Sequence, residues 1–162
     1  MVIDSFEATT SDQFDDMLTS WQRQLVSAKD GPQRRLEASW CDLVSESFRK
    51  SSRGAETFQA WHAIAAQSDG NAYARTIEAM RGFDISERLH ELACPVLFLR
   101  GELDPMVDND SNLRMSTKPR NASAGVIAGS KHLPNVDNTA AFNEALLSWL
   151  KKFGLTHEPK IL

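Results

Sequence analysis

A short apolar run at residues 96–99 constrains the fold of this chain more than any other stretch. Pro95 precedes the run and Gly101 closes it, so turn residues bound it on both sides. An uninterrupted apolar run of this length predicts a strand that is buried on both faces, as in a parallel sheet covered by helices. Asp104 follows just beyond the carboxyl end of this strand, the edge where open parallel sheets bind ligands. The run therefore predicts an α/β fold and the side of the sheet that carries the chemistry.

Composition and charge argue against several classes of protein. The 162 residues suit one domain, and a formal net charge of −4 without a basic stripe argues against a nucleic-acid partner. Cys41 and Cys94 lie far apart without companion ligands, which predicts no disulfide framework and no metal site and favours a reducing, cytoplasmic compartment. No apolar run approaches the roughly 20 residues of a membrane span, and the first residues do not resemble a signal peptide. No motif for a cofactor is present.

The first half of the chain has the periodicity of helices. Val2 and Ile3 form a very short apolar start, which fits either a disordered tail or the last half of a buried strand. Apolar residues then recur at steps of three and four, which predicts an amphipathic helix in each of four stretches. These stretches are residues 12–28, 32–48, 58–65 and 73–80. A further short helix is expected at residues 85–92, leading into the buried strand.

The second half alternates strands and helices. A helix is expected at residues 109–116, a second buried strand at 122–128, and a final helix that begins near 139 and ends before Gly154. A strand–helix–strand–helix order predicts parallel strands joined by a right-handed crossover. The preceding helical block is too long for one crossover, so we expect it to be an inserted cap. Residues 156–162 are polar enough to fray.

Asp104 and His132 are the candidate catalytic residues, because each follows one of the two predicted strands. Adjacent parallel strands bring their carboxyl ends together, so the two side chains can meet. An Asp that binds one ring nitrogen of a His fixes its tautomer and stabilises the imidazolium, which is the acid–base half of a nucleophilic triad. Taken singly, Asp104 would be an ordinary turn residue and His132 a loop histidine; their joint position favours the pair.

Three segments make the chain resemble the C-terminal part of the α/β-hydrolase family. They are residues 94–104 (CPVLFLRGELD), 126–132 (VIAGSKH) and 142–150 (FNEALLSWL). In that family a triad acid follows strand seven and the His follows strand eight, so the resemblance assigns these roles to Asp104 and His132. Residues 132–137 and 75–84 are most similar to small ester and lactone hydrolases such as 3-oxoadipate enol-lactonases.

The resemblance implies a partial α/β-hydrolase fold of about three parallel strands, equivalent to strands six to eight. It divides the chain into a short strand and linker at 1–9, a helical cap at 10–82, a C-terminal α/β portion at 83–154 and a tail at 155–162. The cap would be inserted after the first strand. The implied activity is Ser-His-Asp hydrolysis of small esters or lactones.

The nucleophile of such a site has no counterpart in this sequence. The family carries it in a Gly-x-Ser-x-Gly elbow before strand six, and no such motif occurs here. Ser130 lies on the same loop as His132 without an elbow, and Cys94 precedes a Pro at the wrong end of its strand, where we expect a buried, inert thiol. Two hypotheses follow: the chain supplies the acid and the His of a hydrolase, or it is a non-catalytic remnant that binds a ligand or partner.

An open strand edge at Val2 and Ile3 is the expected interaction surface. Its partner would be an N-terminal half or a second copy of the chain, since an unpaired apolar edge favours strand pairing. A small ester or lactone would bind once the site is complete. Neither a nucleic acid nor a membrane is an expected partner.

Overall fold

The structure, a computed structural model, describes residues 1–155 and divides into two compact units. The sheet unit combines Met1–Ser5 with the chain from Leu89 onward, and the helical unit is Phe6–Arg88. The tail expected from residue 155, apart from Leu155 itself, lies outside the described residues. Within the described residues, no helix is long and apolar enough to cross a membrane.

The sheet unit contains three parallel strands in the order β1-β2-β3, which confirms the predicted fold class. The register pairs Val2 with Phe98 on one side of β2, and Leu97 with Ser123 on the other. The elements of this unit, in chain order, are β1 (Val2–Ile3), the 3₁₀ turn η1 (Leu89–Glu91), β2 (Val96–Gly101), α6 (Asn109–Ser116), β3 (Ala122–Ile127), α7 (Pro134–Asp137) and α8 (Thr139–Lys152). Val2 and Ile3 are thus a strand and not a disordered tail.

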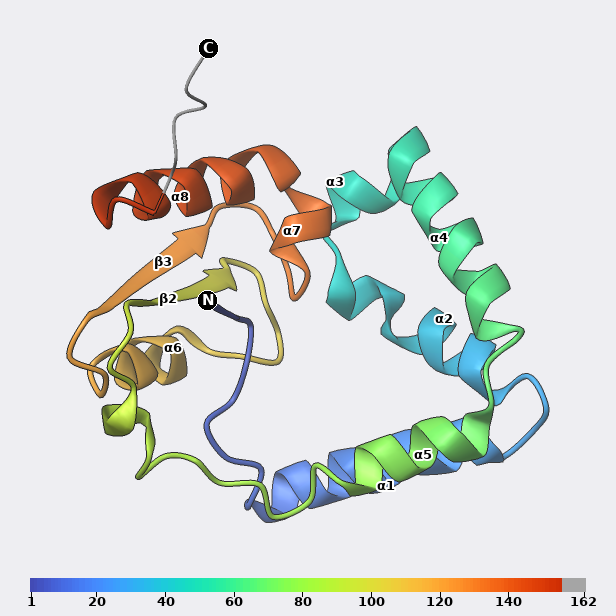
Figure 1. Ribbon diagram of the computed structural model, residues 1–162. Helices are drawn as coiled ribbons and strands as arrows, with labels where there is room; N and C mark the ends of the chain where they lie inside the picture. The colour runs from blue at the N-terminus through green and yellow to red at the C-terminus, as the bar shows by residue number, and fades with distance from the viewer. Residues whose placement is uncertain (156–162) are drawn as a thin grey trace, which may run out of the picture. The chain divides into compact units, whose positions relative to one another are not determined.

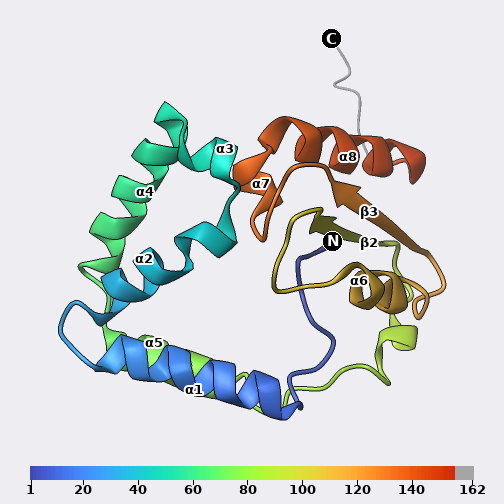
Figure 2. The same ribbon diagram turned by 180° about the vertical axis from the view of Figure 1, so that it is seen from behind.

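The central strand β2 is buried at every position, as the apolar run predicts. Helices α6 and α8 cover opposite faces of the sheet (Figures 1 and 2). Successive side chains of a strand point to opposite faces, so Leu97 and Leu99 share one face. They pack there with Ile127 of β3 and Phe142 of α8. This packing holds the carboxyl ends of β2 and β3 beside each other.

The helical unit has its own small core. Leu18 and Leu25 of α1 pack against Ile77 of α5, and these two helices lie side by side in both views (Figures 1 and 2). The helices of this unit, in chain order, are α1 (Asp12–Val26), α2 (Gly31–Leu43), α3 (Glu46–Arg49), α4 (Ser52–Ala65) and α5 (Gly70–Glu78).

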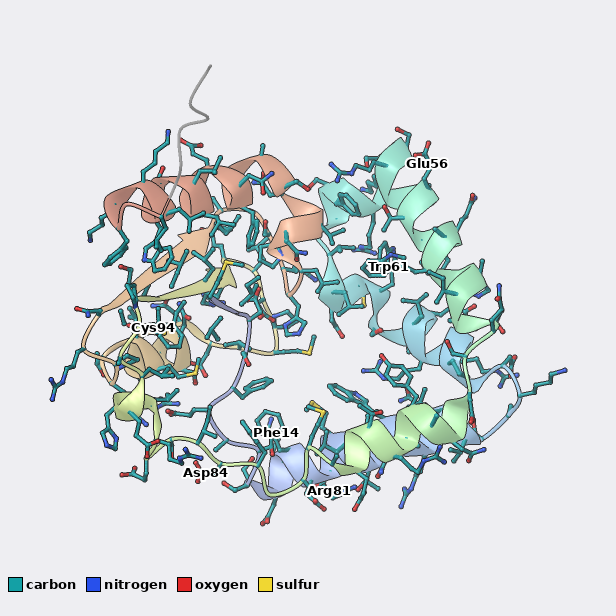
Figure 3. The ribbon with its side chains drawn as sticks, in the orientation of Figure 1. Phe14, Glu56, Trp61, Arg81, Asp84 and Cys94 are labelled. Carbon is teal, nitrogen blue, oxygen red and sulfur yellow. The ribbon has the colours of Figure 1, made fainter. Side chains whose placement is uncertain are left out.

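Aromatic side chains join α2 to α4. Trp61 points from α4 toward α2, where its ring centroid lies 5.6 Å from that of Trp40 (Figure 3). Phe58 packs on the same Trp40 ring with a centroid distance of 5.4 Å. These tryptophans therefore serve helix–helix packing, which is the usual role of aromatic residues at helical spacing.

Two predicted helices differ from the structure. The second helix ends at Leu43, because Val44 is extended and Ser45 caps a separate one-turn helix by accepting a hydrogen bond from the Phe48 N–H. The side chain of Ser can hydrogen-bond to nearby backbone groups in place of the helical carbonyls. Ser is therefore more favourable at the N-cap of a helix than in its interior.

Residues 85–92 form only the turn η1 rather than a helix. The Asp84 carboxylate accepts a hydrogen bond from the Ser86 N–H at 2.8 Å, and the Ile85 N–H donates to the Glu7 carbonyl at 2.9 Å. Pairing of this segment with the residues just before α1, including a bridge between Ala8 and Asp84, replaces the helical hydrogen bonds.

We predict that Phe98→Ala destabilises the sheet unit strongly. Phe98 is 0% exposed at the centre of β2, and emptying such a site costs about 3–5 kcal/mol of unfolding free energy. Leu113→Ala, on the exposed side of α6, is the matched control and should cost less than about 1 kcal/mol. Urea unfolding of both variants measures the difference; equal losses would contradict the central role of β2.

Candidate active site at the strand ends

Each of the three parallel strands is followed at its carboxyl end by a polar side chain. Asp4 follows β1, Asp104 follows β2 and His132 follows β3. One ligand atom from each of these three side chains lies within 4.8 Å of the other two. The sequence predicts two members of this cluster, Asp104 and His132, and the fold brings them together.

Asp104 and His132 are joined by a direct hydrogen bond. The Nδ1 atom of His132 lies 3.1 Å from Oδ2 of Asp104, and the other carboxylate oxygen, Oδ1, accepts a hydrogen bond from the Met106 N–H at 2.8 Å. The Asp104 side chain is 0% exposed, while that of His132 is 20% exposed. The Asp104 carboxylate is therefore held by two hydrogen bonds and shielded from solvent. The His132 imidazole that it binds is partly exposed and accessible to a reactant.

The charge state of Asp104 is set by opposing effects. Burial raises the pKa of this carboxyl. The hydrogen bond with His132, the proximity of the Asp4 carboxyl and the hydrogen bond from the Met106 N–H each lower it. The lowering effects prevail, so the pKa of Asp104 lies below its ordinary value and the group is ionised at neutral pH. An ionised carboxylate on Nδ1 can orient an imidazole and stabilise its protonated form.

Arg100 shapes the loop that carries the acid. It is the charged residue within β2, and its buried guanidinium donates from Nε to the Val107 carbonyl at 3.1 Å. Its Nη2 atom lies 3.4 Å from the carbonyl oxygens of both Glu102 and Asp104. The guanidinium thus binds three backbone carbonyls of the loop that follows β2 and holds that loop at the strand end. Sequence patterning alone did not single out this residue.

The turn after β2 is also tied to the turn after β3. The N–H groups of Glu102 and Leu103 donate to the carbonyls of Ile127 and Ser130 at 3.0 and 2.8 Å. The Glu102 carboxylate in turn accepts a hydrogen bond from the Gly129 N–H at 2.8 Å. These bonds connect the acid-bearing segment with the His-bearing segment, so the distance between Asp104 and His132 follows from the backbone.

Asp4 is a member of the cluster that sequence reasoning missed. Its φ is 38°, a left-handed conformation that Asp adopts more readily than most residues. Its N–H donates to the Leu99 carbonyl at 2.9 Å, and its Oδ1 accepts a hydrogen bond from the Gly101 N–H at 2.9 Å. The rule that selects Asp104, an acidic residue just after a strand, would find Asp4 only if Val2 and Ile3 were already assigned to a strand.

The pKa of Asp4 departs far from its ordinary value. Burial, followed by the neighbouring Asp104 carboxyl, raises it to about 8, although the Gly101 N–H and Arg100 act in the opposite direction. Asp4 is therefore protonated at neutral pH. Its Oδ2 is buried and has no hydrogen-bond partner among the described residues.

The three side chains are also the group in the described part of the chain whose spacing could suit a metal ion. Two carboxylates and an imidazole would offer oxygen and nitrogen ligands. However, Asp104 Oδ2 and His132 Nδ1 already bind each other at 3.1 Å. The arrangement is that of a hydrogen-bonded acid–His pair.

Neither of the two alternative nucleophiles weighed in the sequence analysis is presented to a substrate at this site. Ser130 is 0% exposed, so its hydroxyl is closed to solvent. The expectation of a buried Cys94 is wrong: its side chain is exposed, because the residue lies in the bend ahead of Pro95 and outside the sheet (Figure 3). Cys94 thus precedes the amino end of β2, opposite to the end that carries Asp104.

Among the described residues, no other histidine belongs to this cluster. His62 of α4 lies in the helical unit, where its Nε2 is 2.8 Å from Oε1 of Glu37. His90 belongs to the turn η1 ahead of β2, and His157 lies outside the described residues.

We predict that Gly101→Ala separates the acid from the His. A Cβ at this position would lie 2.0 Å from the Lys131 carbonyl oxygen, so the two turns would have to move apart. The overpacking should cost about 1–3 kcal/mol of unfolding free energy. Leu103→Ala, at an exposed side chain in the same turn, is the control and should cost less than about 1 kcal/mol. Chemical denaturation checks both values, and a Gly101→Ala variant as stable as the control would contradict the close approach.

Comparison with known proteins identifies the fold. No model of a known protein family matches the sequence, and no curated protein matches it. Among solved structures, an esterase from Thermogutta terrifontis matches with a TM-score of 0.77 and 20% identity, over 93% of this chain and 54% of its own. The enol-lactonase from Burkholderia xenovorans matches with a TM-score of 0.79 and 13% identity, over 92% of this chain and 54% of its own.

A third matching structure is described as an α/β hydrolase. It is an α/β-hydrolase enzyme from a Medee basin deep-sea metagenome, with a TM-score of 0.76 and 14% identity, covering 99% of this chain and 57% of its own. At such identities the likeness establishes the fold, and the chain spans about half the length of these enzymes. The three-stranded sheet with its helices is thus a part of the α/β-hydrolase fold.

Proposed function

We propose that this chain supplies the acid and the histidine of a Ser-His-Asp hydrolase. The supporting observation is the hydrogen bond between His132 Nδ1 and the buried Asp104 carboxylate, at the carboxyl ends of adjacent parallel strands. In this role, Asp104 holds the tautomer in which Nε2 of His132 is free to accept a proton. His132 acts first as general base and then as general acid.

The proposed reaction is hydrolysis of a small ester or lactone. A serine hydroxyl gives its proton to His132 Nε2 and attacks the acyl carbon; the imidazolium then protonates the leaving alkoxide. Water attacks the acyl-enzyme with the same residue as base, which releases the acid and restores the serine. The substrate class is taken from the matched structures, whose names include esterases and an enol-lactonase.

We propose that the serine comes from a segment outside this sequence. The 162 residues contain no Gly-x-Ser-x-Gly elbow, and the matched enzymes are nearly twice as long as the matched region. The oxyanion-hole amides, which come from the residue after the nucleophile and an earlier loop, would belong to the same segment. The helices of residues 10–82 would be the cap, with residues 83–154 the catalytic portion. A cytoplasmic location fits the two separate cysteines.

The second candidate is a non-catalytic binding module of the same ancestry. The missing nucleophile motif favours it. The coding sequence upstream of the Met1 codon discriminates between the two. An in-frame Gly-x-Ser-x-Gly some tens of codons upstream would support the hydrolase, and its absence would leave the hydrolase without a nucleophile.

We predict that the 162-residue chain alone hydrolyses p-nitrophenyl esters at the rate of buffer, and that an added elbow-bearing segment confers activity. Removal of the base or acid from that complex, by His132→Ala or Asp104→Ala, should lower kcat at least about a thousandfold. His62→Ala is the matched control, because it also removes a histidine paired with a carboxylate. Activity that survives His132→Ala would refute the proposed role.

We predict that the chain self-associates, or pairs with an N-terminal half, through the outer edge of β1. Among the described strands, Val2 and Ile3 pair with β2 on one side, and their other edge has no strand against it. Such edges favour pairing with another chain. Sedimentation should show mass rising with concentration, and Val2→Lys should reduce this effect, because a charged edge side chain opposes strand pairing. A strictly monomeric chain at high concentration would contradict the prediction.

A further inference from the structure

Two buried carboxyl groups share the strand-end cluster, and their environments differ. Asp104 receives hydrogen bonds from His132 and from the Met106 N–H, one on each oxygen. Asp4 receives one, from the Gly101 N–H to Oδ1, while its Oδ2 is buried without a partner among the described residues. Asp4 is 7% exposed, so water does not readily satisfy this oxygen.

Two carboxylates this close do not both ionise readily. One oxygen of Asp4 lies within 4.8 Å of one oxygen of Asp104, and like charges at such a distance raise the proton affinity of one member of the pair. The charged groups facing Asp4 are Asp104 and His132 at the neighbouring strand ends and Arg100 of β2. Asp104 accepts more hydrogen bonds than Asp4, and these bonds stabilise its negative charge. The proton of the pair is therefore bound by Asp4.

We propose that Asp4 is a positioning residue, whose protonated carboxyl donates a hydrogen bond from Oδ2 to the Asp104 carboxylate. This bond satisfies the orphaned buried oxygen. It also adds a third donor to Asp104, beside His132 Nδ1 and the Met106 N–H, and so fixes the plane of the carboxylate that orients the imidazole. A pKa of about 8 for Asp4 accords with this placement of the proton.

A neutral Asp4 limits the cluster to one negative charge. A second carboxylate charge beside His132 would favour the imidazolium, which cannot accept a proton from a nucleophile. Above about pH 8, where Asp4 ionises, the donor is lost and the repulsion returns. The importance of Asp4 for catalysis rests on the proposed function, but the position of the proton does not, and it can be measured without turnover.

The Gly101 amide is the reporter for this measurement, because its N–H donates to Asp4 Oδ1 at 2.9 Å. In ¹H–¹⁵N spectra of the 162-residue chain, we expect this resonance to shift with a midpoint near pH 8. The step should persist in His132→Gln, which removes the nearby imidazole, and vanish in Asp4→Asn. In Asp104→Asn it should move down by about one pH unit or more, since the neighbouring charge is gone.

Two results would overturn this placement of the proton. One is a wild-type midpoint below about pH 5, the range of an ordinary Asp. The other is a step near pH 8 that survives Asp4→Asn unchanged.

The positioning role has its own readout, the low-field Nδ1–H resonance of His132. Asp4→Asn keeps a side-chain donor for Asp104 and an acceptor for Gly101, and Asn also tolerates a φ of 38°. We expect the resonance to remain sharp in Asp4→Asn and to broaden beyond detection in Asp4→Ala, as the carboxylate loses its third bond. A sharp resonance in Asp4→Ala would show that Asp4 does not position Asp104. Should Asp4→Ala fail to fold, the pH titration of the Gly101 amide in the wild-type chain still tests whether Asp4 binds the proton.

Discussion

A strand buried on both faces must satisfy its polar groups without water, and the structure around β2 follows from that requirement. The backbone of β2 is paired on both sides, with β1 and with β3. Its charged residue, Arg100, binds the carbonyls of Glu102, Asp104 and Val107. An unpaired buried guanidinium would cost several kcal/mol, so the turn after β2 folds back over the strand end. The position of Asp104 is therefore a consequence of burying β2.

Parallel pairing then converts three separate chain segments into one site. Asp4, Asp104 and His132 are separated in the sequence by whole strands and helices, but each lies in the loop that follows its strand, and parallel strands end at the same edge. The absence of a Cβ at Gly101 lets the turn after β2 approach the Lys131 carbonyl. With any larger residue, the acid and the histidine would lie on turns that are further apart.

The sequence predicted features that depend on local pattern and topology. The apolar run at β2, the helix Asn109–Ser116 and the meeting of Asp104 with His132 all follow from periodicity and parallel pairing. Sequence analysis missed the break at Val44 and the extended pairing of residues 84 and 85. Apolar spacing continues through both places, while hydrogen bonds to other segments decide the backbone conformation. Sequence analysis missed Asp4 for a related reason. A two-residue strand gives too little pattern to identify the residue after it as a strand-end position.

Burial alone does not determine what a carboxyl group does in this cluster. Burial raises the proton affinity of both Asp4 and Asp104, yet their pKa values move in opposite directions. The difference lies in the donors: Asp104 has one on each oxygen, and Asp4 has one on a single oxygen. The sheet thus gives two chemically identical side chains different charge states: Asp104 is an anion hydrogen-bonded to His132, and Asp4 favours its neutral acid form. Each carboxyl has one backbone donor, the Met106 N–H for Asp104 and the Gly101 N–H for Asp4. The division therefore rests on the imidazole of His132, which hydrogen-bonds to Asp104.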